Sequence, residues 1–223
     1  MISSIVDLLA PHYCCGCGKV GSVLCESCKY DIISEATPRC LHCRNAIRSA
    51  CLACHSLPYS LSTYVGERTD ALKRLIDDSK FESCRAGCDA QADLLHGVIP
   101  QLEASAVIVP LPTIAAHIRQ RGYGHTERIA RRLAKCRNVA YDPIVKRTIR
   151  QYVQHGANRA TRLKQAKMSF VVHARLSPEV QYVLIDDVVT TGASMRYAAR
   201  ALREAGANTV WAFATSRQSM TDA

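Results

Sequence analysis

The sequence has few aromatic residues and no long apolar run. One Trp, three Phe and nine Tyr make aromatics only 6% of its 223 residues, so a nucleic-acid surface built mainly on base stacking is thinly supplied. No stretch approaches the roughly 18 to 20 apolar residues that span a bilayer, so we expect no transmembrane segment. The opening MISSIVDLLAP lacks a basic lead and carries Asp7 inside its apolar stretch. We therefore expect a short amphipathic helix there rather than a secretory signal.

Acidic side chains are scarce between His117 and Lys167. Fourteen Lys or Arg residues stand there against only Glu127 and Asp142, which accounts for about the whole net charge of +10. Such a segment suits a phosphate-rich ligand or nucleic acid. The alternative is a solvated surface that aids solubility. The candidate nucleic-acid contacts are the basic residues of one predicted helix, Arg128, Arg131, Arg132 and Lys135.

The spacing of the twelve cysteines does not favour a secreted disulfide scaffold. Eight of them form two blocks with the same x2, x7, x2 spacing, offset by 26 residues: Cys14, Cys17, Cys25, Cys28 and Cys40, Cys43, Cys51, Cys54. Two CxxC turns point four sulfurs at one centre, about 2.3 Å from a zinc ion. A segment this short buries little apolar surface, so metal binding supplies its folding energy. We predict two structural Zn2+ sites in a small domain over residues 1–56, and a cytoplasmic location.

Several arrangements of these metal sites stay open. Pairing within each block is the simplest, but a crossed pairing uses the same eight cysteines. Disulfides, a single metal, or an exchange of ligands with Cys15, His42 or His55 are further alternatives. A four-thiolate site has no open coordination position, so we expect no catalysis there. Three cysteines lack partners at this spacing and are expected to be buried thiols: Cys84, Cys88 and Cys136.

Residues 57–223 alternate between strand and helix patterns and are predicted to form a second domain. Strand patterns cover 60–65, 106–110, 169–174, 183–187 and 209–215, and helical patterns cover 68–81, 89–102, 125–136 and 194–206. Thr126 is expected to cap the third of these helices. The alternation predicts an α/β fold with a mostly parallel sheet flanked by helices. Ligands of such sheets lie beyond the carboxyl ends of the strands, so the loops that follow 106–110 and 183–187 are predicted to line one cleft.

The segment VLIDDVVTTGASM, residues 183–195, combines two kinds of ligand-binding group. The strand delivers Asp186 and Asp187 to the carboxyl edge of the sheet, and a helix begins directly after Thr190–Ser194. Amides at a helix start have no helical partner and bind anions, and Gly192 lets a phosphate approach the backbone. The carboxylates can accept hydrogen bonds from sugar hydroxyls or help to place a metal ion. The segment therefore favours a ribose 5-phosphate; the structural alternative is a capped turn followed by an ordinary helix.

The same segment resembles the 13-residue signature for 5-phosphoribosyl 1-diphosphate (PRPP) in type I phosphoribosyltransferases. Three further features are the VPLP motif at 109–112, RQRGYGHTE at 119–127 and QxxxxRxxR at 154–162. With the cysteine pairs, they make residues 11–215 similar to the ComF family. Its members couple a zinc-ribbon head to a phosphoribosyltransferase-type domain and are associated with natural competence for DNA uptake. They usually read RGFN-Gln where this chain has RGYGH, so Gly124 and His125 are departures.

The resemblance implies a type I phosphoribosyltransferase fold behind a double zinc-ribbon domain, and a role for each matching residue. The residues it implies in binding PRPP with Mg2+ are Lys80, Pro110, Leu111, Pro112, Thr113, Arg119, Arg121, Asp186, Asp187, Val188, Val189, Thr190, Thr191, Gly192, Ala193 and Ser194. The residues it implies in catalysis are Asp186, Asp187, Arg159 and Arg162. The two arginines would close over the leaving group from a flexible hood over 147–167. The Leu111–Pro112 bond is a candidate cis peptide.

Three functions are consistent with these features. The first is a phosphoribosyltransferase, in which Mg2+ and basic side chains offset the charge of the departing pyrophosphate. The second is a PRPP-sensing or scaffold protein that keeps the site without turnover. The third is a protein that handles single-stranded DNA, in which the zinc ribbons and the basic segment contact the DNA backbone. Other competence proteins would be its partners. The first and third are compatible, and no segment that would bind an acceptor base is recognisable.

Overall fold

A five-stranded parallel sheet forms the centre of the protein. The structure is a computed structural model and describes residues 11–47, 51, 54, 56–81, 84–149 and 168–218. The sheet has the order β1–β7–β6–β2–β3, and every neighbouring pair is parallel. Its strands are β1 (Leu61–Glu67), β2 (Val107–Pro110), β3 (Ala140–Tyr141), β6 (Gln181–Val189) and β7 (Thr209–Arg217). The predicted α/β fold with a mostly parallel sheet is confirmed.

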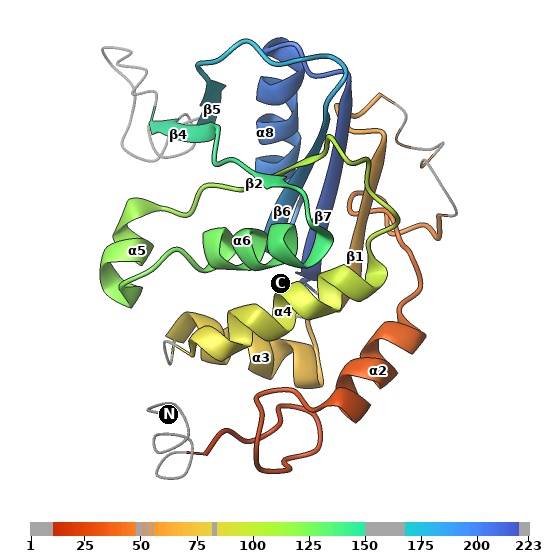
Figure 1. The fold of residues 1–223 in the computed structure, drawn as a ribbon, viewed down its shortest axis with the longest axis vertical. Helices are drawn as coiled ribbons and strands as arrows, with labels where there is room; N and C mark the ends of the chain where they lie inside the picture. Colours follow the sequence, from red (N-terminus) through yellow and green to blue (C-terminus); the bar gives the residue numbers. More distant parts are fainter. Residues whose placement is uncertain are drawn as a thin grey trace, which may run out of the picture.

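Helices cover both faces of this sheet (Figure 1). On one face lie α3 (Asp70–Phe81), α4 (Arg85–Val98) and α6 (His125–Arg137), and on the other lies α8 (Ala193–Glu204). The side chains of the central strand β6 alternate between the two layers: Val183 and Ile185 are buried with α4 and α6, and Leu184 with α8. Burial on both faces explains why β6 reads as a continuous apolar run. None of the described helices is long and apolar enough to cross a membrane.

The remaining described elements are small. They are α2 (Glu26–Glu35), α5 (Ala115–Arg121), and an antiparallel pair of strands, β4 (Val145–Ile149) and β5 (Met168–Val172). The strand predicted over 169–174 is therefore present as β5, but it pairs with β4 outside the parallel sheet. Residues 150–167, which make up most of the predicted hood, lie outside the described residues. So do the predicted opening helix at 1–10 and His55.

A turn that contains Gly122 and Gly124 joins α5 to α6 and sets where α6 begins. Gly122 ends α5 with φ 77°, a left-handed conformation that glycine adopts without strain. The next helix begins at His125, after Gly124, and has no side-chain cap. The predicted cap at Thr126 is therefore wrong: Thr126 lies inside the helix and is 2% exposed. Packing of this first turn into the core has prevailed over local capping preference, and it carries His125 inward.

Candidate functional site

Eight cysteines form two separate four-sulfur clusters in the N-terminal quarter of the chain. Within each cluster the sulfur atoms all lie within 4.8 Å of one another, and the clusters are Cys14, Cys17, Cys25, Cys28 and Cys40, Cys43, Cys51, Cys54. The grouping is therefore the sequential one, not the crossed one. All twelve cysteines are free thiols, which excludes the disulfide alternative for this structure.

The geometry of both clusters fits a tetrahedral zinc ion. Sulfurs about 2.3 Å from zinc are about 3.8 Å apart, and the Sγ–Sγ distances are 3.7 Å for Cys17–Cys25 and 3.4 Å for Cys43–Cys51. Burial raises the pKa of Cys14 and Cys40, but backbone N–H groups that point at these sulfurs outweigh burial. They lower the two pKa values to about 6 and about 7, which favours one thiolate in each cluster near neutral pH, whereas neighbouring sulfurs and burial raise the pKa values of Cys28, Cys51 and Cys54.

The other cysteines stand apart from the clusters. Cys15 is buried and its Sγ donates to Asp78 Oδ2 at 3.4 Å, so it is not exchanged into the first cluster. Cys88 is fully buried, as predicted, whereas Cys84 is half-buried. The prediction is wrong for Cys136, which lies exposed in the last turn of α6. That turn contributes its apolar side, with Leu133, to the core and leaves Cys136 on the solvent side.

Many of the predicted ligand-binding residues meet in a second place, at the carboxyl edge of the sheet. A cavity of about 230 Å³ lies there between the end of α3, the loop after β2, and the end of β6. The predicted residues that line it are Lys80, Leu111, Pro112, Thr113, Arg121, Asp186, Asp187, Val188 and Ser194. Arg147, the first residue of the predicted hood, also lines it, as do side chains that were not predicted, among them His117, His125 and Phe170. The loops after β2 and β6 thus border one cleft.

The two aspartates at the end of β6 have different environments. Asp187 is buried, and its Oδ2 lies 2.5 Å from Lys80 Nζ and 2.8 Å from His125 Nε2. Burial raises the pKa of Asp187, but Lys80 and His125 outweigh burial and hold that pKa well below its ordinary range. Asp186 is half-buried beside the cleft, where burial and the charge of Asp187 raise its pKa well above the ordinary range. Asp187 is thus ionised and already paired. Asp186 Oδ1 accepts the Asp187 backbone N–H at 2.9 Å, and the Asp186 carboxyl lines the cleft.

His125 connects Asp187 to the rim of the cleft. Its Nδ1 lies 3.2 Å from Arg121 Nη1, and its side chain is 6% exposed. A guanidinium only donates hydrogen bonds, so Nδ1 accepts in this contact and a ring proton on Nε2 faces Asp187 Oδ2. From the sequence, His125 is only a departure from RGFN-Gln. Its contact depends on the Gly122–Gly124 turn meeting β6, which no local pattern encodes.

The loop between β6 and α8 forms a small hollow. Gly192 has φ 74°, and α8 begins at the next residue, so the first amides of the helix have no helical acceptor. The Ala193 N–H makes only a long contact with Thr191 Oγ1, at 3.4 Å. The hollow measures about 50 Å³ and is lined by Asp186 and residues 188–195. Its size and its donors suit a phosphate monoester.

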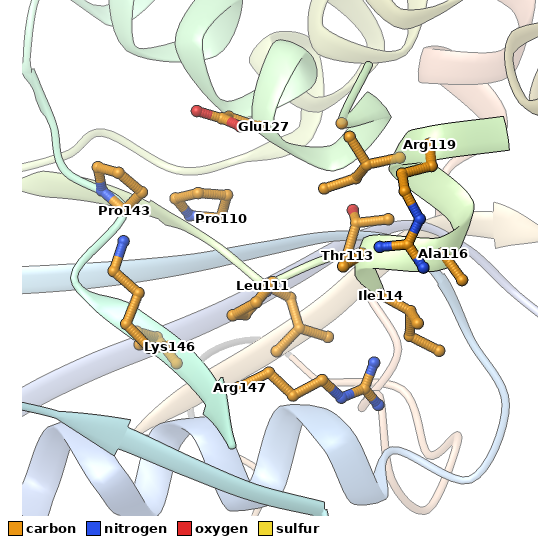
Figure 2. Close-up of a pocket in the computed structure, with 15 residues that line it drawn as sticks. Pro110, Leu111, Thr113, Ile114, Ala116, Arg119, Glu127, Pro143, Lys146 and Arg147 are labelled. Atoms are coloured by element: carbon orange, nitrogen blue, oxygen red, sulfur yellow. The ribbon is translucent and has the colours of Figure 1, made fainter. Parts of the chain in front are cut away.

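A larger cavity lies on the other side of the loop that follows β2. It measures about 630 Å³ and lies between that loop, α5 and β4 (Figure 2). Pro110 and Leu111 contribute to an apolar wall, and Arg119, Lys146 and Glu127 supply charges. Two predicted ligand-binding residues, Pro110 and Arg119, line this cavity instead of the cleft. The described residues contain no cis peptide bond, so the expected cis bond at Leu111–Pro112 is wrong.

Three of the four candidate nucleic-acid contacts on α6 are engaged with acids. Arg128 lies 2.6 Å from Asp89 and Arg132 lies 3.2 Å from Asp93, which ties α6 to α4. Arg131 pairs with Glu127 of its own helix at 2.9 Å. Lys135 is exposed on the same helix. The basic surplus seen in the sequence is therefore partly neutralised by α4. The predicted catalytic arginines, Arg159 and Arg162, lie outside the described residues.

Comparison with known proteins bears on the origin of this architecture. The chain is 25% identical over 210 residues to competence protein F of Haemophilus influenzae, and the alignment covers 87% of this chain and 90% of that protein. The chain is a homologue of competence protein F. The resemblance to the ComF family, drawn from the cysteine pairs and the motifs at 109–112, 119–127, 154–162 and 183–195, is confirmed. No protein-family model matches the chain.

The two clusters predict the metal content of the ComF homologue. Purified protein is expected to contain about two zinc ions per chain, and Cys17→Ser or Cys43→Ser should each remove about one, because each substitution breaks one cluster. Elemental analysis by mass spectrometry measures this content. Cys136→Ser, at an exposed thiol outside both clusters, is the control and should keep both ions. A wild-type chain without zinc, or with disulfides in its place, would contradict the assignment.

Replacing Asp186 or Asp187 by Asn should change the free energy of unfolding in opposite directions. Asp187→Asn leaves Lys80 without its buried partner and should destabilise the protein by about 3 to 5 kcal/mol. Asp186→Asn removes a desolvated carboxyl beside a charge and should stabilise it by about 1 kcal/mol or more near neutral pH.

The pH dependence follows from the raised pKa of Asp186. Wild-type protein keeps the full contribution of Asp186 below its unfolded-state pKa and loses it as pH rises through the folded-state pKa. The advantage of Asp186→Asn should therefore grow as the pH rises above about 4, and urea denaturation at several pH values measures it. Equal destabilisation by both substitutions at every pH would contradict the two environments.

Proposed function

We propose that this ComF homologue binds PRPP with Mg2+ in the cleft and transfers its ribosyl 5-phosphate group. One observation carries the proposal: the hollow before α8 and the cleft border each other and share Asp186, Val188 and Ser194. A ribose 5-phosphate has the same polarity, with a phosphate at one end and a vicinal diol at the other. The phosphate would accept hydrogen bonds from the Thr190–Ser194 amides while the diol donates to the aspartates.

Basic side chains around the rest of the cleft suit the diphosphate end of the ligand. Lys80, Arg121 and Arg147 line the same cavity as Asp186. In the proposed reaction the acceptor forms a bond to the anomeric carbon as the bond from that carbon to the diphosphate oxygen breaks. The electron pair leaves with the diphosphate, and the basic side chains offset its charge. When bound, Mg2+ would neutralise further charge on the same group.

The acidic pair has a separate part in this proposal. The sugar gains positive character at the anomeric carbon as the diphosphate leaves, and carboxylates near the ring favour that charge. Asp187 would be held in place by Lys80 and His125 throughout, whereas Asp186 would lose its proton on meeting the ligand and Mg2+. The hood arginines Arg159 and Arg162 belong to the same proposal through the family resemblance alone. Binding of PRPP without turnover is the alternative that uses the same site.

Ligand binding should raise the melting temperature of the wild-type protein. At about 100 times the dissociation constant, PRPP with Mg2+ adds about 2.7 kcal/mol, which corresponds to about 5 °C or more for a chain of this size. Asp186→Asn should abolish the shift, because it removes a carboxylate that lines the cleft, and Lys135→Ala, outside the cleft, should retain it. Differential scanning fluorimetry gives the shifts and titration calorimetry the affinities. An unshifted wild-type protein would refute the proposal.

Handling of single-stranded DNA is a second proposal, favoured by the competence protein to which this chain is homologous. The α6 side chains that face solvent most freely are Arg131, whose side chain is 60% exposed, and Lys135. Arg128 and Arg132 hold α4 and are poorer candidates. A backbone contact would be electrostatic, since aromatic residues are few in the basic segment.

Salt dependence tests this second proposal. Replacing both Arg131 and Lys135 by Ala should weaken binding of a single-stranded oligonucleotide and reduce the slope of log affinity against log salt by about 1.4. Arg200→Ala, an exposed arginine on α8, is the control and should leave the slope unchanged. Fluorescence anisotropy at several salt concentrations measures both. An equal fall of the slope in the Arg200→Ala control, or binding that does not depend on salt concentration, would contradict a role of α6 in binding single-stranded DNA.

A further inference from the structure

The two cysteine clusters are built into opposite faces of the sheet. Cys14, Cys15 and Leu24, from the first cluster's segment, belong to the buried core beneath α4 and α6. Leu41, which lies between two ligands of the second cluster, is fully buried in the core on the α8 side. That core also contains Val189, the last residue of β6, and Met195 in the first turn of α8. The second cluster's CxxC turn therefore inserts a side chain between the start and the end of the loop that joins β6 to α8, residues 190–192, the phosphate loop.

Hydrogen bonds tie the same turn to the strand ends that carry the loop. Arg217, 6% exposed, lies opposite Val189 in the β6–β7 ladder and donates to the carbonyl oxygens of Leu41 and, at 3.5 Å, His42. Arg44 Nη2 donates to the Gln218 carbonyl at 2.8 Å, and the Gln218 N–H donates to the Val189 carbonyl at 2.9 Å. The backbone around the second cluster is thus fixed to the residue from which the loop departs.

The turn also lies directly against the loop's left-handed glycine. A Cβ placed on Gly192 would be 3.9 Å from His42 Nδ1 and 4.0 Å from the Leu41 carbonyl oxygen. Gly192 is the residue immediately before α8, so the turn lies beside the backbone whose amides line the hollow. The first cluster's segment instead meets α3, through the hydrogen bond from Cys15 to Asp78.

We propose that metal binding by the second cluster holds the phosphate loop in its anion-binding conformation. Metal loading at Cys40, Cys43, Cys51 and Cys54 would then control the affinity of the cleft for a phosphorylated ligand, while loading of the first cluster would not. Without metal, the CxxC turn loses its tetrahedral constraint, so the Leu41 and Arg217 anchors loosen and the loop opens locally. The identity of the ligand rests on the proposed function, but the coupling concerns the loop itself.

The repeat in the sequence offers a matched pair of variants, Cys43→Ser and Cys17→Ser, each at the second cysteine of its block. Hydrogen exchange of the amides in 189–195, followed by mass spectrometry, reports on the loop without any ligand. Cys43→Ser should speed this exchange and weaken binding of PRPP with Mg2+ by about tenfold or more, as expected for loss of a charge-assisted anchor. Cys17→Ser, although it also loses about one zinc ion, should leave both within about twofold of wild type.

A third variant, Arg217→Gln, keeps every cysteine and decides the matter if Cys43→Ser fails to fold. It should retain about two zinc ions and still speed exchange in 189–195, because the contacts from Arg217 to the Leu41 and His42 carbonyls are lost. Unchanged exchange in a folded Cys43→Ser protein that has lost its zinc would overturn the coupling, as would equal effects from both cysteine variants. A wild-type chain that binds no PRPP would refute the proposed function alone, since the exchange comparison stands without ligand.

Discussion

The buried contact of Asp187 with Lys80 and His125 is the interaction on which the cleft depends. A carboxylate withdrawn from water at the end of β6 must be matched by charge and hydrogen bonds, and α3 and α6 supply them. Three elements that are distant in the sequence are thereby fixed against one edge of the sheet. The same contact distinguishes the two aspartates, because the Asp187 carboxylate joins β6 to α3 and α6 whereas the Asp186 carboxyl lines the cleft.

The chain surrounds this cleft with two kinds of anion-binding group, each with a different origin. Backbone amides before α8 arise from helix geometry and need only a glycine and small residues. Basic side chains such as Lys80 and Arg147 come from α3 and β4, on either side of the acidic pair. The second cysteine cluster then abuts the backbone part through Leu41 and Arg217. The second cysteine cluster and the hollow before α8 are therefore neighbours, although more than a hundred residues separate them in the sequence.

Features that the sequence predicted correctly are those encoded over short stretches. Four sulfurs converge because each CxxC turn aims two of them locally, and β6, its loop and α8 follow from one contiguous segment. Contacts between distant segments could not be predicted: Asp187 meets His125 only after the parallel sheet has formed, and Arg217 meets Leu41 across 176 residues. The pairing of Arg128 with Asp89 is similar, since a basic helix looks free until α4 packs beside it.

In the proposed function, the hollow before α8 and the aspartate pair hold opposite ends of one sugar phosphate. A crystal structure of the protein grown with PRPP and Mg2+ tests it most directly. We expect the 5-phosphate on the Thr190–Ser194 amides, the ribose hydroxyls on the Asp186 and Asp187 carboxylates, and the diphosphate near Lys80. Ligand bound in the larger cavity beside Arg119 instead, with the hollow before α8 left empty, would contradict it.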